Sequence, residues 1–249
     1  MTLPLHVDAP RPHLLKEMTP GEVAEAMSRD PRLIVPVGTC EQHGPHLPMG
    51  AATLIAERLA DDLSATYGVL RAPTVEYGVN LETERDFAGN ATMRKKTLHR
   101  MLNDLLASWE ETGFAEFILL TAHEYDPHLE ALATVITARA RVRVVDLYTI
   151  QTPDLLEGQP GHMHGDEVET SLLLHLQPEL VRMPLARDHP MSLEAARRYR
   201  GGRARVPKDS AGSVGRPTLA TAEKGRAIYE RIRRRIAERI FLAPPPPDE

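Results

Sequence analysis

The sequence predicts an α/β protein built on a mostly parallel β-sheet, with helices on both faces. Short, mainly apolar runs alternate with amphipathic segments of helical spacing from about residue 22 to residue 176. Such alternation is typical of parallel strands joined by crossover helices. Strands buried on both faces are expected to be short apolar runs, and four segments fit this description: 33–37, 69–75, 117–121 and 142–147.

The expected helices carry start and stop signals. Thr19, Pro20 and Glu22 have the spacing of a capping box with proline in the first turn, so a helix should start there and run to about residue 28. Gly68 and Gly113 follow two of the other amphipathic segments, as glycine commonly does at a helix end. These other segments are 53–67, 98–112, 127–140, 167–176 and 221–241.

The length and composition favour one large domain spanning residues 1–249. The chain has 249 residues, 42% of them hydrophobic, which is enough for a substantial core. Within it we expect a core at about 14–185, a C-terminal helix at about 221–241 and a proline-rich tail at 243–249, which cannot continue the helix.

Charge and cysteine content exclude several classes of protein. A net charge of −5 argues against a nucleic-acid or anionic-membrane partner. We interpret the arginine clusters at 197–205 and 231–235 as solvated helix faces or subunit contacts. The single cysteine, Cys40, excludes an internal disulfide, and we expect it to be a small buried residue rather than a nucleophile. No segment resembles a signal peptide or a membrane helix, so the chain is expected to be cytoplasmic.

A first polar cluster follows the strand expected at 33–37. Glu41 and His43 lie two positions apart, which places both side chains on the same side of an extended segment, and His46 follows. Carboxylate and neutral imidazole are ordinary ligands of zinc, manganese and iron. Alone, this pattern fits a metal site and a polar loop with hydrogen-bonded histidines equally well.

Two further clusters of the same kind follow later in the chain. One comes directly after the strand at 117–121 and contains His123, Glu124, Tyr125 and Asp126. The other precedes or opens the helix at 167–176 and contains His162, His164, Asp166 and Glu169. A capping role is the alternative for Glu169 in that first turn. In open sheets of this kind, ligands lie beyond the carboxyl ends of the strands. Three such clusters therefore favour one shared metal site.

These blocks resemble the creatininase family of metal-dependent amidohydrolases. The segment Glu41-Gln-His43-Gly-Pro-His46-Leu-Pro is similar to the family's Glu-Gln-His-Gly-Pro-His-Leu-Pro, Thr121-Ala-His123 to its Asn-Gly-His, and His164-Gly-Asp-Glu-Val-Glu169-Thr-Ser to its His-Ala-Gly-x-x-Glu-Thr-Ser. The blocks come in the family's order, and the resemblance covers about residues 14–185.

The resemblance implies a three-layer α/β/α subunit, commonly in a homohexamer. It also implies two divalent metals and a water between them that attacks an amide of a small molecule or short peptide. For this chain we expect one or two ions of zinc, manganese or iron, or none. Carried over to this chain, Glu41 and His123 would hold one metal, and His43 and Glu169 the other. His164 would transfer a proton near the leaving group.

Several other residues are added as candidates. We expect Glu124 to take part in catalysis. The residues expected to contact the substrate are His46, Glu84, Tyr125 and Asp126.

Four positions depart from the family pattern. Ala52 stands where the family has its metal-bridging Asp, Glu84 where it has a His, Thr121-Ala122 where it has Asn-Gly, and Tyr125 where creatininase itself has a ligand carboxylate. A bridging carboxylate offsets the repulsion between two close cations, so its loss leaves three alternatives. In the first, the site binds a single metal. In the second, a nearby acid (Glu84, Glu124, Asp126 or Asp166) replaces the Asp. In the third, the site contains no metal.

Two classes of function follow from these alternatives. The leading prediction is a metal-dependent hydrolase of a C–N bond in an amide, cyclic amide or formamide. The alternative is a repurposed or inactive relative that acts in binding or in different biosynthetic chemistry, such as lactone opening.

Overall fold

A five-stranded, all-parallel sheet forms the centre of the computed structural model, which describes residues 11–81, 84, 86–192, 194–195, 198 and 210–242. The strand order is β1-β3-β2-β4-β5. The bounds are β1 His13–Leu14, β2 Arg32–Pro36, β3 Leu70–Arg71, β4 Glu116–Thr121 and β5 Arg141–Asp146. The register pairs Pro36 with Leu120 and Thr121 with Asp146, so β2, β4 and β5 end at the same edge of the sheet.

Helices connect the strands and cover the sheet. They are α1 Pro20–Arg29, α2 Ala51–Tyr67, α3 Lys95–Glu111, α4 Asp126–Ala133, α5 Glu167–Leu176 and α7 Ala222–Ile236. Short 3-10 turns span Leu15–Glu17, Leu147–Thr149, Pro153–Leu155, Pro178–Leu180, Met183–Leu185 and Pro217–Leu219, and a π-helical turn, Ala237–Phe241, extends α7. No helix within the described residues is long and apolar enough to span a membrane.

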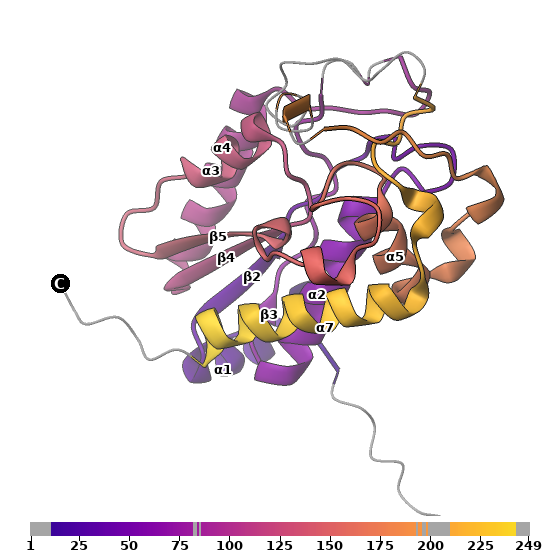
Figure 1. Cartoon of the computed structure of the whole chain (residues 1–249). Helices are drawn as coiled ribbons and strands as arrows, with labels where there is room; N and C mark the ends of the chain where they lie inside the picture. The colour runs from indigo at the N-terminus through magenta and orange to yellow at the C-terminus, as the bar shows by residue number, and fades with distance from the viewer. Residues whose placement is uncertain are drawn as a thin grey trace, which may run out of the picture.

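Alternate residues of the central strands face two separate apolar cores. Ile34 and Ile118 pack with α2, α5 and α7 on one side, while Leu33 and Phe117 pack with α1, α3 and α4 on the other. In Figure 1, α2, α5 and α7 lie together, and α3 and α4 lie together across the sheet from them. Successive side chains of a strand point to opposite faces. The molecule is thus an α/β/α sandwich, which confirms the predicted fold class.

The predicted helix starts and stops are confirmed where they depend on residues next to the helix end. The Thr19 hydroxyl accepts a hydrogen bond from the Glu22 amide, and the Glu22 carboxylate accepts one from the Thr19 amide. Together these two bonds form the capping box. Gly68 ends α2 in the left-handed region, with φ of 70°. The helix predicted at 167–176 has the same bounds as α5.

Two predicted elements are shorter than expected, and one strand was missed. Pro73 has no backbone N–H, and β3 ends before it, although Val75 still forms a bridge to Val37. Helix α4 stops at Ala133 because the following residues turn and donate their amides to the Glu110 carboxylate. The strand that the sequence analysis missed is the short β1, His13–Leu14.

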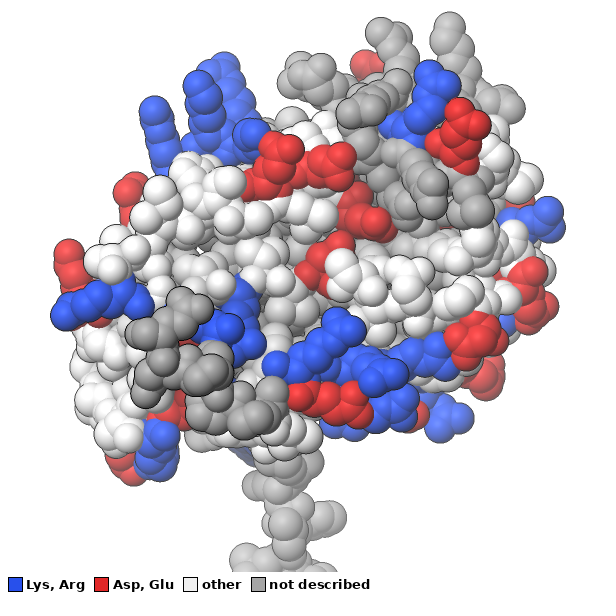
Figure 2. All heavy atoms as spheres, turned by 60° about the vertical axis from the view of Figure 1, so that its left-hand side comes forward, with Lys and Arg blue, Asp and Glu red and all other residues white. Residues whose placement is uncertain are grey.

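The arginines near the C-terminus behave as a solvated helix face. Arg233, Arg234 and Arg235 are exposed on α7, and Figure 2 shows Lys and Arg gathered in a band over this part of the surface. Of the other arginine cluster, only Arg198 lies within the described residues, and it is exposed. The proline-rich tail lies outside the described residues.

Candidate metal centre

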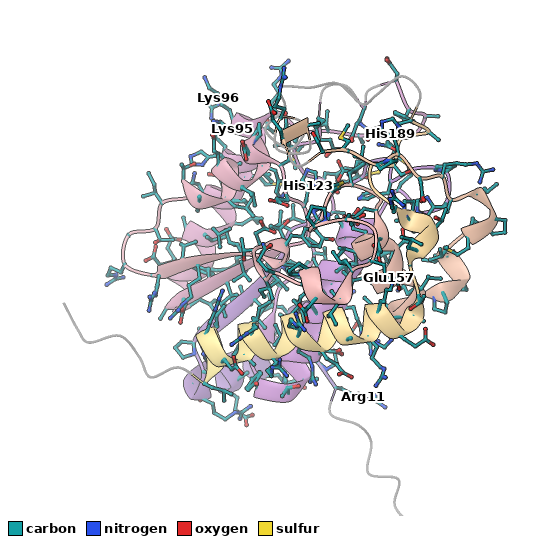
Figure 3. All side chains as sticks on the ribbon, in the orientation of Figure 1. Arg11, Lys95, Lys96, His123, Glu157 and His189 are labelled. Atoms are coloured by element: carbon teal, nitrogen blue, oxygen red, sulfur yellow. The ribbon has the colours of Figure 1, made fainter. Side chains whose placement is uncertain are left out.

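Three loops at the carboxyl edge of the sheet bring the predicted ligands together. Glu41 and His43 lie in the loop between β2 and α2, and His123 directly follows β4. Glu169 lies in the first turn of α5, which the third loop precedes. Because β2 and β4 end level with each other, their loops meet, and Figure 3 shows His123 in the interior of the molecule.

Glu41 is the centre of the first group of ligand atoms. Its Oε1 lies 2.8 Å from His123 Nδ1 and 3.7 Å from His43 Nε2, and all three side chains are buried. The Thr39 hydroxyl donates to the same oxygen at 3.0 Å. His123 Nε2 lies 3.0 Å from the Val79 carbonyl, which can only accept a hydrogen bond. Nε2 therefore donates to Val79, and Nδ1 faces the Glu41 carboxylate at hydrogen-bond distance.

Glu169 is the centre of the second group. Its Oε1 lies 3.6 Å from His43 Nε2 and 3.4 Å from His162 Nε2. The Tyr148 hydroxyl donates to Oε1 at 3.2 Å, and the Gly165 amide donates to Oε2 at 2.6 Å. These two donors fix the carboxylate so that it faces the imidazoles.

Asp166 is adjacent to this second group but has a different task. Its carboxylate caps α5 by accepting hydrogen bonds from the backbone amides of Val168 and Glu169. It also accepts a hydrogen bond from the Met163 amide. Asp166, His162 and Glu169 are close enough to share an ion. However, the capping bonds occupy Asp166, so we interpret it as the residue that holds Glu169 in place.

The charges of the buried groups depend on one another. Burial alone would lower the pKa of His43, but the carboxylates of Glu169 and Glu41 outweigh burial and raise this pKa to about 9. Burial opposes ionisation of Glu41 and Glu169, yet neighbouring histidines hold both of their pKa values below the usual range. Without a metal, the site thus contains a protonated His43 between two carboxylates.

The ligand atoms have the spacing of a metal site. Among the described residues, Glu41 Oε2 and His43 Nε2 are buried and have no hydrogen-bond partner. Ligands bound to zinc at about 2.1 Å in a tetrahedron lie about 3.4 Å from each other. Three of the observed separations, 3.4 to 3.7 Å, are close to that value, whereas Glu41 and His123 are at hydrogen-bond distance, 2.8 Å. A divalent cation that takes the place of the His43 proton would give both atoms a partner, so the residues fit such an ion.

His164, the predicted proton-transfer residue, lies beside this centre. Its ring stacks on His43, with centroids 4.7 Å apart. Its Nε2 lies 2.8 Å from the Gln42 carbonyl and 3.3 Å from Glu84 Oε1. Burial first, and then the charge of His43, lower the pKa of His164 to about 4. The imidazole is therefore neutral at pH 7.

Comparison with known proteins assigns the chain to a family. The family model for creatininase, described as creatinine amidohydrolase, matches residues 16–240. The chain belongs to the creatininase family.

Two curated relatives of this family are hydrolases. A mycofactocin precursor peptide peptidase from Mycobacterium tuberculosis is 29% identical over 93% of each chain. A creatinine amidohydrolase from Pseudomonas putida is 25% identical over 90% of this chain and 94% of its own.

The solved structures that match include metal forms of creatininase. One, named "Creatininase Mn", has 25% identity and a TM-score of 0.80 and covers 94% of this chain and 100% of its own. A mutant creatininase of "Zn-Zn type" has 25% identity and a TM-score of 0.79, with 94% and 99% covered. Creatininase-family neighbours thus contain manganese or zinc.

The other residues predicted from the family motifs have different positions. Glu84 is buried against His164, as described above. His46 is buried, with Nε2 2.8 Å from the Thr170 hydroxyl, and burial and the His43 charge lower its pKa to about 4. The Tyr125 ring lies 6.0 Å from the His123 ring. Asp126 is exposed in the first turn of α4, where its charge suits the helix N-terminus.

Two further residues that the sequence analysis discussed, Ala52 and Cys40, differ in their burial. Ala52 is fully buried in the first turn of α2 and belongs to an apolar core. Cys40, expected to be buried, is half-buried, and its thiol lies 3.6 Å from the Gly89 carbonyl.

Sequence reasoning gave no role to two residues that the structure places at the centre. His162 was only one member of a polar cluster, and Gln42, whose side chain lies 3.0 Å from His164 Nε2, was only part of a motif. Glu124 lies 3.2 Å from His162 rather than beside the first ligand group. The alternation His162-Met-His164 was the available signal, because it allows two imidazoles to face the site from one extended segment.

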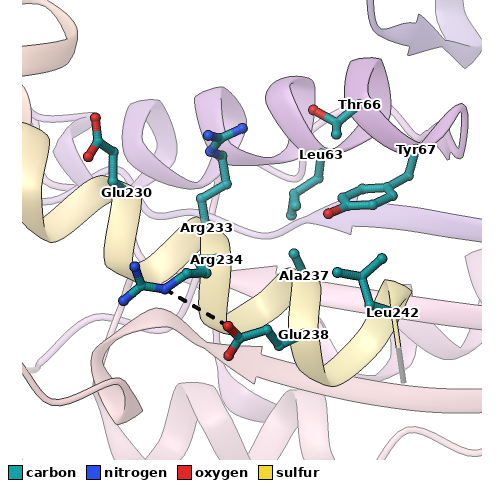
Figure 4. Close-up of a pocket in the computed structure, with 9 residues that line it drawn as sticks. All are labelled: Leu63, Thr66, Tyr67, Glu230, Arg233, Arg234, Ala237, Glu238 and Leu242. Atoms are coloured by element: carbon teal, nitrogen blue, oxygen red, sulfur yellow. Dashed lines mark ion pairs between the residues drawn. The ribbon is translucent and has the colours of Figure 1, made fainter. Parts of the chain in front are cut away.

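A separate hollow of about 410 Å³ lies between α2 and α7. Figure 4 shows Leu63 and Tyr67 of α2 facing Arg233 and Ala237 of α7, with an ion pair between Arg234 and Glu238 nearby. None of the predicted ligands lines it. We therefore do not interpret this hollow as part of the metal centre.

Proposed function

We propose that this chain is a metal-dependent hydrolase that cleaves a C–N bond in a small amide or a short peptide. The observation that carries the proposal is the convergence of buried carboxylates and imidazoles, with Glu41 Oε2 and His43 Nε2 lacking hydrogen-bond partners among the described residues. Family membership and the hydrolase relatives support the reaction type. They favour a hydrolase over a repurposed binding protein.

The residues divide into two ligand sets. Glu41 and His123 would hold one ion, and His43 and Glu169 the other, with zinc, manganese or iron as candidates. When bound, such an ion lowers the pKa of a water to about 7 and polarises a carbonyl. The hydrogen bonds from Thr39 to Glu41 and from Tyr148 to Glu169 keep the carboxylates oriented. The chain's own contribution is thus a preformed, buried set of carboxylate and imidazole ligands.

His164 is our candidate for proton transfer. Its neutral imidazole takes up a proton at Nδ1 while Nε2–H donates to the Gln42 carbonyl or to Glu84. A carboxylate beside the Nε2–H stabilises the imidazolium, as in a His–Asp pair. The proton then passes to the leaving nitrogen, which departs as an amine. Glu124, His46, Tyr125 and Asp126 remain candidates for substrate contacts or proton transfer.

The test combines metal loading with a substrate panel. Protein stripped with a chelator and reloaded with zinc, manganese or iron is offered cyclic amides, formamides and short peptides. We expect metal-dependent turnover, and we expect Glu41→Ala and His123→Ala to lose metal together with activity. A protein that takes up none of these metals would refute the proposal. Binding of the metal with no hydrolysis of any amide class would favour the repurposed alternative.

We also infer a cytoplasmic homo-oligomer, with a hexamer as the expectation from the family resemblance. Large apolar side chains are exposed on the described surface, including Tyr77, Ile136 and Leu185, and such side chains are candidates for subunit contacts. Light scattering coupled to size-exclusion chromatography measures the assembly. The mass of a single chain at micromolar concentration would contradict the inference.

A further inference from the structure

His162 has contacts that tie it to the metal centre and to a separate carboxylate. Its side chain is buried, in the loop that leads into α5. The two ring nitrogens face opposite partners: Nε2 lies 3.4 Å from Glu169 Oε1, and Nδ1 lies 3.2 Å from Glu124 Oε2. The ring lies flat on Tyr148, with centroids 3.5 Å apart and an interplanar angle of 7°. The side chain is thus fixed from three directions.

We propose that His162 is a direct metal ligand through Nε2, and that Glu124 orients it from behind. The proposal rests on the proposed function, because it assumes a divalent cation beside Glu169. A carboxylate can only accept the Nδ1 hydrogen, which leaves the Nε2 lone pair directed at the ion. Carboxylate–histidine–metal triads of this kind fix the tautomer and raise the basicity of the ligand.

Both nearby imidazoles approach the same carboxylate oxygen. His43 Nε2 lies 3.6 Å and His162 Nε2 lies 3.4 Å from Glu169 Oε1. These separations are close to the roughly 3.4 Å edge of a tetrahedral zinc site. If His43 and His162 held one ion together with Glu169, that ion would have three protein ligands, the number found in catalytic zinc sites.

This assignment also compensates for Ala52. The bridging carboxylate of the family pattern would give each ion one more ligand, and alanine gives none. A third side chain, the His162 imidazole, restores the ligand count at one ion without adding charge. Glu124 then has a role that needs no direct contact with the first ligand group.

Two substitutions test the ligand atom of His162 and the orienting carboxylate of Glu124 independently. His162→Asn retains a polar group where Nδ1 meets Glu124 but removes Nε2, whereas Glu124→Gln retains the shape of the side chain and removes its charge. Zinc affinity is measured by competition with a chelator, and zinc per chain by elemental analysis. Loss of an outer partner such as Glu124 should weaken binding about 10- to 100-fold, and His162→Asn should weaken one site more than that.

A matched control and a direct count complete the test. His175→Asn makes the same change at a half-buried position on α5 that packs beside Tyr229, and it should bind zinc like the wild type. X-ray absorption on the zinc-loaded wild type counts imidazoles directly and needs no variant to fold. His162→Asn should lose one imidazole from that count.

The outcomes separate this proposal from the proposed function. If His162→Asn binds zinc like the wild type while Glu41→Ala does not, the metal centre remains but His162 is not a ligand. An imidazole count that His162→Asn leaves unchanged also overturns the assignment, even if the affinity falls. If the wild type binds no zinc, manganese or iron, both proposals fail.

Discussion

Asp146, at the end of β5, is a single residue whose charge opposes folding. Burial raises its pKa to about 6, the amide of Tyr148 partly opposes this shift, and Glu124 adds to it. A carboxyl group with a raised pKa in the folded state stabilises the protein fully below its unfolded pKa of 3.8. That stability is lost as the pH rises through about 6.

Asp146→Asn should therefore stabilise the metal-free protein at neutral pH. The amide oxygen can still accept the Tyr148 amide, while the buried charge is removed. We expect the difference in unfolding free energy between variant and wild type to grow by about 3 kcal/mol from pH 4 to pH 7.5, which is two pKa units. Denaturant titrations at both pH values measure it. A difference independent of pH would contradict the argument.

The substitution Ala52→Asp tests whether this position corresponds to the bridging acid of the family pattern. The residue is fully buried in an apolar core, so Ala52→Asp places a carboxylate where water cannot reach it. Without metal, we expect a loss of about 3 kcal/mol and a melting temperature lower by about 6–12 °C. Excess zinc should raise the melting temperature of the variant more than that of the wild type. Equal zinc shifts would show that position 52 does not face the ion.

The convergence of the proposed ligands was partly predictable from sequence. Glu41, His43, His123 and Glu169 follow strands or open a helix, and parallel strands place such positions at one edge. His162 could not be assigned because its role depends on Tyr148 and Glu124, which lie far from it along the chain. Sequence spacing cannot give the orientation of a ring that is fixed by such distant partners.

At the level of elements, α5, which carries the proposed ligand Glu169, packs closely against α7. A Cβ on Gly225 of α7 would lie 1.8 Å from the backbone oxygen of Ser171 on α5. Backbone cannot move aside as a side chain does, so Gly225→Ala must separate the two helices. Glu169 lies on α5, two residues before Ser171, and would be displaced with the helix.

Gly225→Ala should thus lower both stability and metal affinity. We expect a loss of about 3 kcal/mol in unfolding free energy, at the upper end for overpacking. The control is Gly21→Ala in α1, where an added Cβ meets nothing within 4 Å. That variant should be neutral or more stable by about 0.4–1 kcal/mol. Equal stability of the two variants would show that α5 and α7 do not pack as described.

The elements themselves were predictable where the signals are local. The Thr19–Glu22 capping box and the Gly68 stop lie within one or two turns of the structure they determine. The end of α4 was predicted too late, because it depends on Glu110, a residue of α3 that accepts the amides beyond it. Contacts between elements decided the boundaries that the local sequence left open.

For the whole molecule, the alternation of strands and helices was sufficient to predict the sandwich. Alternate apolar residues of β2 and β4 supply two cores, and parallel strands bring their ends to one edge. The number of ions is a property of this assembled edge. Our proposals make it depend on the ligands that His162 and Glu169 supply in the absence of an acid at position 52.

Anomalous diffraction from crystals soaked in zinc or manganese tests the central claim directly. We predict at least one strong peak within bonding distance of His43 and Glu169, with any second peak between Glu41 and His123. No peak at the carboxyl edge of the sheet, in protein whose ligand side chains are well ordered, would contradict the account.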